Sequence, residues 1–313
     1  MEYVDRGQIR IWACCAAVWL LLAPQAIAQK PRKYIQWRQR DRLKIKKILK
    51  HVKEHEGEFH VRTERYKIRT QVDAAFTAQL GYYMDHLCKD FLRIFKYPIR
   101  VQLRPTVYIL KDQEAYQEAL GKETESRGMF RYRWKGSEWT DFTLYSYIKH
   151  PHETDFRCFY LPILNHEGTH QIVQMQAGKN TVHIFLNEGL ATYCQFMRIG
   201  ERDPDARNRR SCFLRLAVQA NQENRLPSLE SFVHLDGPWD VDGYGPQTNL
   251  RYGCAESFVA FLVESRAGQK FLARIYEAAL AGQSLESSFG GNTRPIEASW
   301  RRYLGELKAR GID

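Results

Sequence analysis

Residues 166–170 read H-E-G-T-H, and this short stretch decides how the rest of the chain is interpreted. Residues four apart on an α-helix differ by about 40° around its axis, so His166 and His170 project from one face and can share a metal ion. Glu167, about 100° from His166, stands beside that pair. The pattern predicts a helix with two zinc ligands and a carboxylate that can take a proton from a metal-bound water.

A second segment, L-N-E-G-L-A-T-Y at residues 186–193, also reads as a helix and carries Glu188. A catalytic zinc site has three protein ligands and keeps a fourth position open for water. Glu188 would complete the set begun by His166 and His170. The alternative is a surface helix that carries two histidines and a glutamate by chance, and the second acidic segment argues against it.

Taken together, the two motifs resemble those of the gluzincin metallopeptidases, and most closely the peptidase-MA-like family of secreted bacterial proteins. The likeness extends over about residues 58–282 and is sharp only in the motifs themselves. It implies a zincin-like fold in which His166, His170 and Glu188 bind Zn²⁺. It also implies that Glu167 is the general base of peptide-bond hydrolysis.

The resemblance suggests a further catalytic residue and one departure. Zinc aminopeptidases place a tyrosine at the start of a helix, where its hydroxyl donates to the oxyanion. Tyr252 matches that position; the alternatives are that Tyr252 only packs there, or that Tyr244 serves instead. The same enzymes bind the substrate's amino group through the glutamate of a G-x-M-E-N motif, whereas residues 128–131 read G-M-F-R, and Glu138 and Asp141 lie further on. The difference favours cleavage within a peptide chain.

The N-terminus predicts export. Arg6 and Arg10 precede an apolar run at residues 11–23, which is too short to span a bilayer comfortably, and A-I-A at residues 26–28 fits a signal peptidase site. Residues 1–28 are therefore interpreted as a signal peptide, with an uncleaved anchor as the alternative. The mature protein is expected to be periplasmic or extracellular and to have no transmembrane span.

Positive charge is concentrated just after this segment. Residues 30–53 contain eleven Lys or Arg and one acid, Asp41, and so carry +10 of the chain's net charge of +11. Such an arm favours an anionic partner such as a cell-envelope surface, and a solvated helix face is the alternative. Nucleic acid is not expected for an exported protein.

The hydrophobic pattern predicts an α+β protein with a mixed sheet, followed by a mainly helical C-terminal lobe. The expected divisions are a signal peptide at 1–28, a basic helical arm at 29–57, an α/β lobe at 58–200 and a helical lobe at 201–313. The expected elements are helices at 34–56, 72–97 and 112–120, strands at 59–63 and 101–110, an aromatic strand region at 128–147, a loop at 236–249, and helices at 212–222, 252–263, 269–281 and 296–308. The aromatic region is either an edge strand that pairs with substrate, as in gluzincins, or a hairpin packed into the core.

The function expected from these observations is that of a secreted zinc metallopeptidase acting on peptides or proteins. The alternative is a catalytically inactive relative that binds an envelope partner, and the intact Glu167 argues against it because structural zinc needs no base. The mature chain would hold five cysteines, an odd number whose pairing the spacing does not define.

Overall fold

The computed structural model describes residues 10–12, 32–136, 138–235, 239, 245–290 and 292–312. The chain divides into two compact units. Unit 1 comprises residues 1–88 and 103–171, and unit 2 comprises residues 89–102 and 172–313. Apart from residues 10–12, the predicted signal peptide lies outside the described residues.

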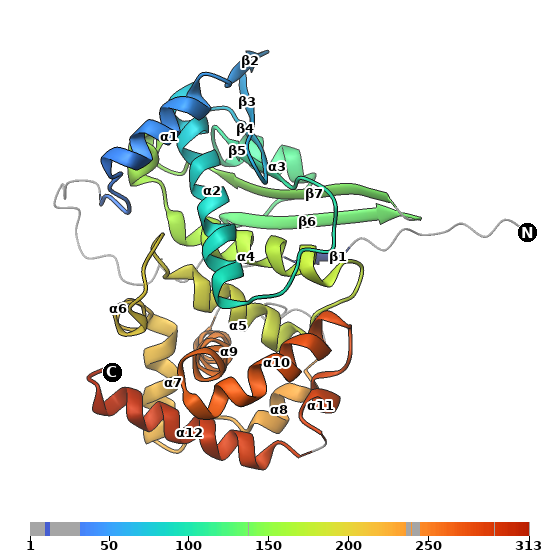
Figure 1. Ribbon diagram of the computed structural model, residues 1–313, viewed down its shortest axis with the longest axis vertical. Helices are drawn as coiled ribbons and strands as arrows, with labels where there is room; N and C mark the ends of the chain where they lie inside the picture. The colour runs from blue at the N-terminus through green and yellow to red at the C-terminus, as the bar shows by residue number, and fades with distance from the viewer. Residues whose placement is uncertain are drawn as a thin grey trace, which may run out of the picture. The chain divides into compact units, whose positions relative to one another are not determined.

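Unit 1 is built on a mixed β-sheet (Figure 1). Its strands are β1 (Arg10–Trp12), β2 (Lys53–His55), β3 (Glu58–Arg62), β4 (Lys67–Thr70), β5 (Thr106–Leu110), β6 (Gly128–Lys135) and β7 (Glu138–Tyr147). They lie in the order β1-β6-β7-β5-β4-β3-β2, with β4, β5 and β7 parallel to one another and the other pairs antiparallel. The expected α+β architecture with a mixed sheet is confirmed.

Helices cover both faces of this sheet. Side chains along each strand alternate between the two faces, and apolar side chains lie on both. On one face, α3 (Gln113–Leu120) packs on a cluster that consists of Tyr108, Leu110, Tyr116, Met129, Tyr145 and Tyr147. On the other face, Leu144 of β7 lies toward α4 (Leu161–Ala177), where a Cβ on Gly168 would come within 3.9 Å of it. Helix α2 (Ala74–Ile94) also packs against α4 near Gly168.

Both ends of α3 follow the expected capping chemistry. The side chain of Asp112 accepts a hydrogen bond from the backbone N–H of Ala115 at 2.9 Å. At the other end, Gly121 adopts a φ of +68°, a left-handed conformation that glycine reaches without strain. The helix predicted at 112–120 is confirmed.

The helix predicted at 34–56 is wrong in its extent. Helix α1 spans Gln39–Leu49, and the chain then forms a hairpin of β2 and β3 in which Lys53 pairs with His60. Glu56 and Gly57 connect the strands with φ values of +51° and +77°. Two consecutive left-handed residues make the tight turn that joins antiparallel strands, so the chain reverses where a continuing helix was expected.

Unit 2 consists of helices in its described residues. Besides the C-terminal parts of α2 and α4, they are α5 (Ile184–Gln195), α6 (Pro204–Asn208), α7 (Cys212–Gln222), α8 (Leu229–Val233), α9 (Pro246–Glu264), α10 (Arg266–Leu280), α11 (Leu285–Ser288) and α12 (Arg294–Ala309). Helix α9 contacts α5, α7, α10 and α12, and it is the element around which this unit packs (Figure 1).

Helix α9 begins earlier than the sequence pattern predicts. It starts at Pro246, the first helical position after Gly245, whereas the pattern placed its start at Tyr252 and a loop over residues 236–249. Proline suits the first turn because its missing N–H has no partner there in any helix. Residues 247–249 are all polar, so no apolar period marks this first turn. Tyr252 therefore lies within the helix.

Two further observations concern cysteines and membranes. Cys88, Cys158, Cys194 and Cys254 are buried thiols, Cys212 is half-buried, and none of these five forms a disulfide. In the described part of the chain, every helix is too short or too polar to cross a bilayer.

Candidate metal centre

Helix α4 carries His166, Glu167 and His170, all of them buried. The Nε2 atoms of the two histidines lie 3.1 Å apart, with the ring planes at 77°. Two nitrogens bound tetrahedrally at about 2.05 Å from one zinc ion would be separated by about 3.3 Å. The two imidazoles are therefore already oriented as neighbouring ligands of one ion.

The third member of the group is Glu188 on α5. One ligand atom from each of His166, His170 and Glu188 lies within 4.8 Å of the others, and Glu188 is 3% exposed. Two imidazoles and one carboxylate match the preference of zinc for nitrogen and oxygen ligands, and three ligands leave one position open. The group can hold a metal ion, and its donor chemistry fits zinc.

Three hydrogen bonds join α4 to other elements of unit 1, and a fourth lies within the helix. The Tyr83 hydroxyl donates to Asn165 Oδ1 at 2.6 Å, and the Thr169 hydroxyl donates to the Asn165 carbonyl at 2.6 Å. Gln171 Nε2 donates to the carbonyls of Thr106 on β5 (3.0 Å) and Phe142 on β7 (3.3 Å). The segment of α4 that contains His166 and His170 is thus held at both ends.

Gly168 lies where α4 packs closely on α2. A Cβ at this position would lie 2.8 Å from Leu87 Cδ2 and 3.1 Å from Met84 Cε, closer than van der Waals contact allows. The middle of the H-E-G-T-H stretch is therefore small because α2 passes directly over it.

Glu167 is directed at the backbone of strand β6. Its Oε2 accepts a hydrogen bond from the N–H of Phe130 at 2.9 Å. The approach is possible because residue 128 is glycine: a Cβ there would lie 2.5 Å from Ile163 Cγ1 and 3.1 Å from Glu167 Cγ. The carboxylate is fully buried, and its negative charge also adds to the effect of burial in raising the pKa of Tyr116. Neither Phe130 nor Gly128 could have been assigned this role from sequence spacing.

Helix α5 is buried along its whole length, which explains why its sequence shows no polar face. Gly189, next to Glu188, permits a close approach to α9, since a Cβ there would lie 2.5 Å from the carbonyl oxygen of Ala255. Thr192, one turn after Glu188, donates its hydroxyl to the Glu188 carbonyl at 2.8 Å. The close packing of α5 on α9 at Gly189 therefore fixes where Glu188 lies.

A buried ionic cluster that the sequence reasoning missed anchors the end of α5. Arg207 Nη1 donates to Glu256 Oε1 at 3.0 Å and to the Tyr193 carbonyl at 3.3 Å, and its Cζ lies 3.8 Å from the Tyr193 ring centroid. Arg207 Nη2 donates to Glu264 Oε1 at 2.8 Å. One guanidinium thus forms ion pairs with two buried carboxylates. Burial raises the pKa of Glu256 to about 7.

The remaining predicted site residues are placed as follows. Tyr252 is buried in α9, 5.7 Å from the ring of Phe213 and 5.4 Å from that of Trp239, measured between centroids. Tyr244 lies outside the described residues. Asp141 forms an ion pair with Arg131 at 2.6 Å, and Glu138 is exposed beside the turn between β6 and β7. The role of Tyr252 stays a prediction.

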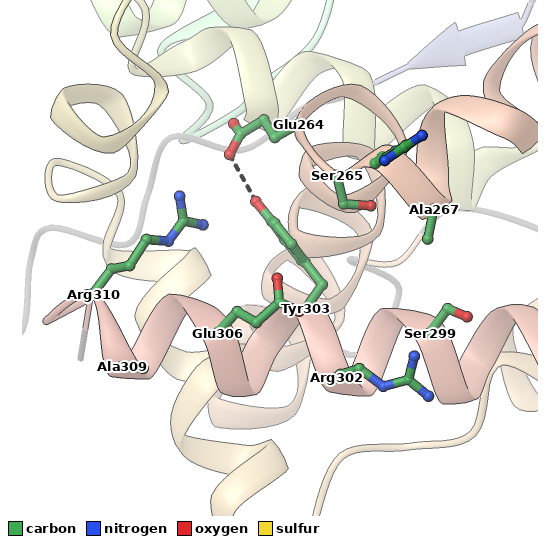
Figure 2. Close-up of a pocket in the computed structure, with 10 residues that line it drawn as sticks. Glu264, Ser265, Ala267, Ser299, Arg302, Tyr303, Glu306, Ala309 and Arg310 are labelled. Atoms are coloured by element: carbon green, nitrogen blue, oxygen red, sulfur yellow. Dashed lines mark hydrogen bonds between the residues drawn. The ribbon is translucent and has the colours of Figure 1, made fainter.

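A surface hollow of about 610 Å³ lies elsewhere in unit 2, along the end of α9, the start of α10 and α12 (Figure 2). Its lining residues are Glu264, Ser265, Arg266, Ala267, Ser299, Arg302, Tyr303, Glu306, Ala309 and Arg310. The Tyr303 hydroxyl donates to Glu264 Oε2 at 2.7 Å, as the dashed line in Figure 2 shows. None of the three candidate metal ligands lines this hollow, so it is separate from the candidate metal centre.

A scan against models of protein families and a search of curated proteins both find no match to this chain.

Proposed function

We propose that the protein is a secreted zinc metallopeptidase of the gluzincin type, with a zincin-like fold. The observation that carries the proposal is the convergence of His166, His170 and Glu188, together with Glu167 on the same helix as the histidines. A structural zinc site closes its fourth position with a protein ligand, whereas three ligands beside a buried carboxylate suit hydrolysis.

His166, His170 and Glu188 would hold the zinc ion. When bound, zinc supplies Lewis acidity, which lowers the pKa of a coordinated water and polarises a peptide carbonyl. Glu167 takes the proton of the attacking water on a carboxylate oxygen and passes it to the nitrogen of the leaving amine. The Phe130 N–H, 2.9 Å from Glu167 Oε2, keeps that carboxylate oriented while the proton moves. Tyr252 would donate its hydroxyl to the oxyanion.

Cleavage within a chain is preferred over removal of N-terminal residues. Asp141 is committed to Arg131 at 2.6 Å, and Glu138 sits exposed near the tip of the β6–β7 hairpin. Neither offers the isolated buried acid that would bind a free amino group. Export by the predicted signal peptide would place this activity in the periplasm or outside the cell.

Replacing Glu167 by Gln tests the proposal. The variant keeps the side-chain volume and the hydrogen bond from Phe130 but lacks the base, so zinc content should stay at the wild-type value while peptide hydrolysis falls by about 10²- to 10⁴-fold. The His166→Ala variant should lose both the metal and the activity. Hydrolysis of a blocked peptide library, with zinc measured on the same samples, distinguishes the two effects. Wild-type turnover by the Glu167→Gln variant would contradict the assignment.

The same library decides between the enzyme and its alternative, an inactive peptidase-like protein that binds an envelope partner. Zinc-dependent hydrolysis of blocked peptides supports the endopeptidase. Zinc binding without hydrolysis of any library member, together with capture of a partner, supports the binding protein.

A further inference from the structure

Helix α1 is held on the body of unit 1 by one face. Ile45 is buried against Ala78 and Tyr82, with Trp37, Ile48 and Val52 packed around them. The indole N–H of Trp37 also donates to Gln79 Oε1 at 2.7 Å. These contacts define which side chains of α1 point inward and which point outward.

The acid of this segment points inward. Asp41 lies one turn before Ile45, and its Oδ1 accepts a hydrogen bond from the Tyr82 hydroxyl at 2.7 Å. Its Oδ2 accepts from the backbone N–H of Arg38 at 3.1 Å. The carboxylate is therefore bound to the body and to the start of the helix, and the outer face of residues 32–53 presents no acid.

The cations of the segment all point outward. The described residues 32–53 contain ten Lys or Arg side chains, and every one is exposed: Arg32, Lys33, Arg38, Arg40, Arg42, Lys44, Lys46, Lys47, Lys50 and Lys53. A helix that merely needs a solvated face can mix both signs of charge. Here only positive charge is presented, over one continuous stretch of chain.

An apolar side chain lies at the centre of this positive face. Leu43 is 57% exposed, and Arg40, Lys47 and Lys50, at positions i−3, i+4 and i+7, share its side of the helix. Leu49, 38% exposed, lies on the flank. Of the three large apolar side chains exposed among the described residues, two are therefore on this one helix.

We propose that this outer face of α1 binds the surface of an anionic lipid bilayer. The cations would lie among the phosphate headgroups, and Leu43 would enter the boundary between headgroups and acyl chains. A soluble polyanion such as nucleic acid or a wall polymer satisfies the charges but offers no apolar layer for a leucine. The inner contacts through Ile45 and Asp41 would orient unit 1 on the membrane.

The test compares binding to two kinds of vesicle, pure phosphatidylcholine and an equal mixture with phosphatidylglycerol, by co-sedimentation. The triple variant Lys46→Gln, Lys47→Gln, Lys50→Gln should bind the anionic vesicles roughly a hundred-fold more weakly, since each cation near such a surface contributes about fivefold. A matched control with the same loss of charge replaces three exposed lysines elsewhere in unit 1, at positions 67, 111 and 149. The control should bind as the wild type does. Because all variants share one N-terminus, differences in their affinity for vesicles report on the outer face of α1.

A second variant separates a membrane from a soluble polyanion. Leu43→Ser should weaken binding to anionic vesicles by roughly three- to tenfold, in keeping with partial loss of one leucine's burial. It should leave binding to polyphosphate or DNA unchanged. Three results would overturn the proposal: wild-type binding that does not depend on phosphatidylglycerol, equal losses in the triple variant and its control, or vesicle binding that is indifferent to Leu43.

Discussion

Replacing Arg207 by Met should be among the most damaging single changes in unit 2. The side chains of Arg207, Glu256 and Glu264 are at most 4% exposed, and the guanidinium is the cation shared by both carboxylates. Removing one partner of a buried ion pair costs about 3–5 kcal/mol, because the charge left behind is not compensated. Methionine fills part of the volume, so the loss reports mainly on charge.

The loss should also depend on pH. Burial already raises the pKa of Glu256 to about 7 in the presence of Arg207, from an ordinary value of 4.5, and loss of the cation raises it further. A carboxyl whose pKa is raised by folding makes the folded state bind more protons than the unfolded state. The loss of folding free energy caused by the buried, ionised Glu256 is therefore absent below about pH 4.5 and grows as the pH rises toward the folded-state pKa. The variant should be closer to wild type at pH 5 than at pH 8.

Urea unfolding followed by far-ultraviolet circular dichroism measures both effects. A loss of about 3–5 kcal/mol corresponds to a midpoint lower by about 1–2.5 M urea for a slope near 2–3 kcal/mol/M. A triple variant that adds Glu256→Gln and Glu264→Gln removes the stranded charges and should regain a large part of the loss. A midpoint within about 0.3 M of the wild type, or a triple variant no more stable than Arg207→Met, would refute the reasoning.

Two further predictions concern stability. Gly189→Ala should lower the unfolding free energy by about 2 kcal/mol or more, because the new Cβ would lie 2.5 Å from a backbone oxygen of α9. Gly305→Ala on α12 should raise it by about 0.5–1 kcal/mol, because a Cβ there meets nothing within 4 Å. Equal effects of the two substitutions in urea unfolding would contradict the packing. Partial burial opposes the ionisation of Glu58, yet hydrogen bonds from Arg69, Tyr108 and Gln71 lower its pKa to about 2. The ionised carboxylate therefore stabilises unit 1 above about pH 4.5, and this contribution is lost as the pH falls toward 2. Glu58→Gln should therefore cost about 1–2 kcal/mol at pH 7, after allowance for solvent screening, and little at pH 2, which unfolding at the two pH values measures.

The local periodicity of the sequence was enough to predict most elements. The helices at 72–97, 112–120 and 212–222 and the strand at 59–63 match α2, α3, α7 and β3 to within a few residues. Each has a strong apolar period or a recognisable cap. The pair of histidines was also predictable, because four-residue spacing fixes their common face whatever the rest of the chain does.

What could not be predicted depends on contacts that are distant in sequence. Strand β4 has only four residues, too few for a reliable period, so it is recognisable only between β3 and β5. The hydrogen bond from Phe130 to Glu167 requires α4 to approach β6 at Gly128, and no local pattern indicates that approach. The Arg207 cluster joins residues about fifty positions apart, which read as an ordinary charged segment until α9 is placed beside it.

The central claim is that His166, His170 and Glu188 bind one zinc ion. Elemental analysis of the purified protein, after removal of loosely bound ions, tests it with wild type, Glu188→Ala and the control Glu138→Ala, which removes an exposed carboxylate. We expect about one zinc per chain in the wild type and the control, and much less in Glu188→Ala. A wild-type protein without zinc, or a Glu188→Ala variant with as much zinc as the wild type, would contradict the account.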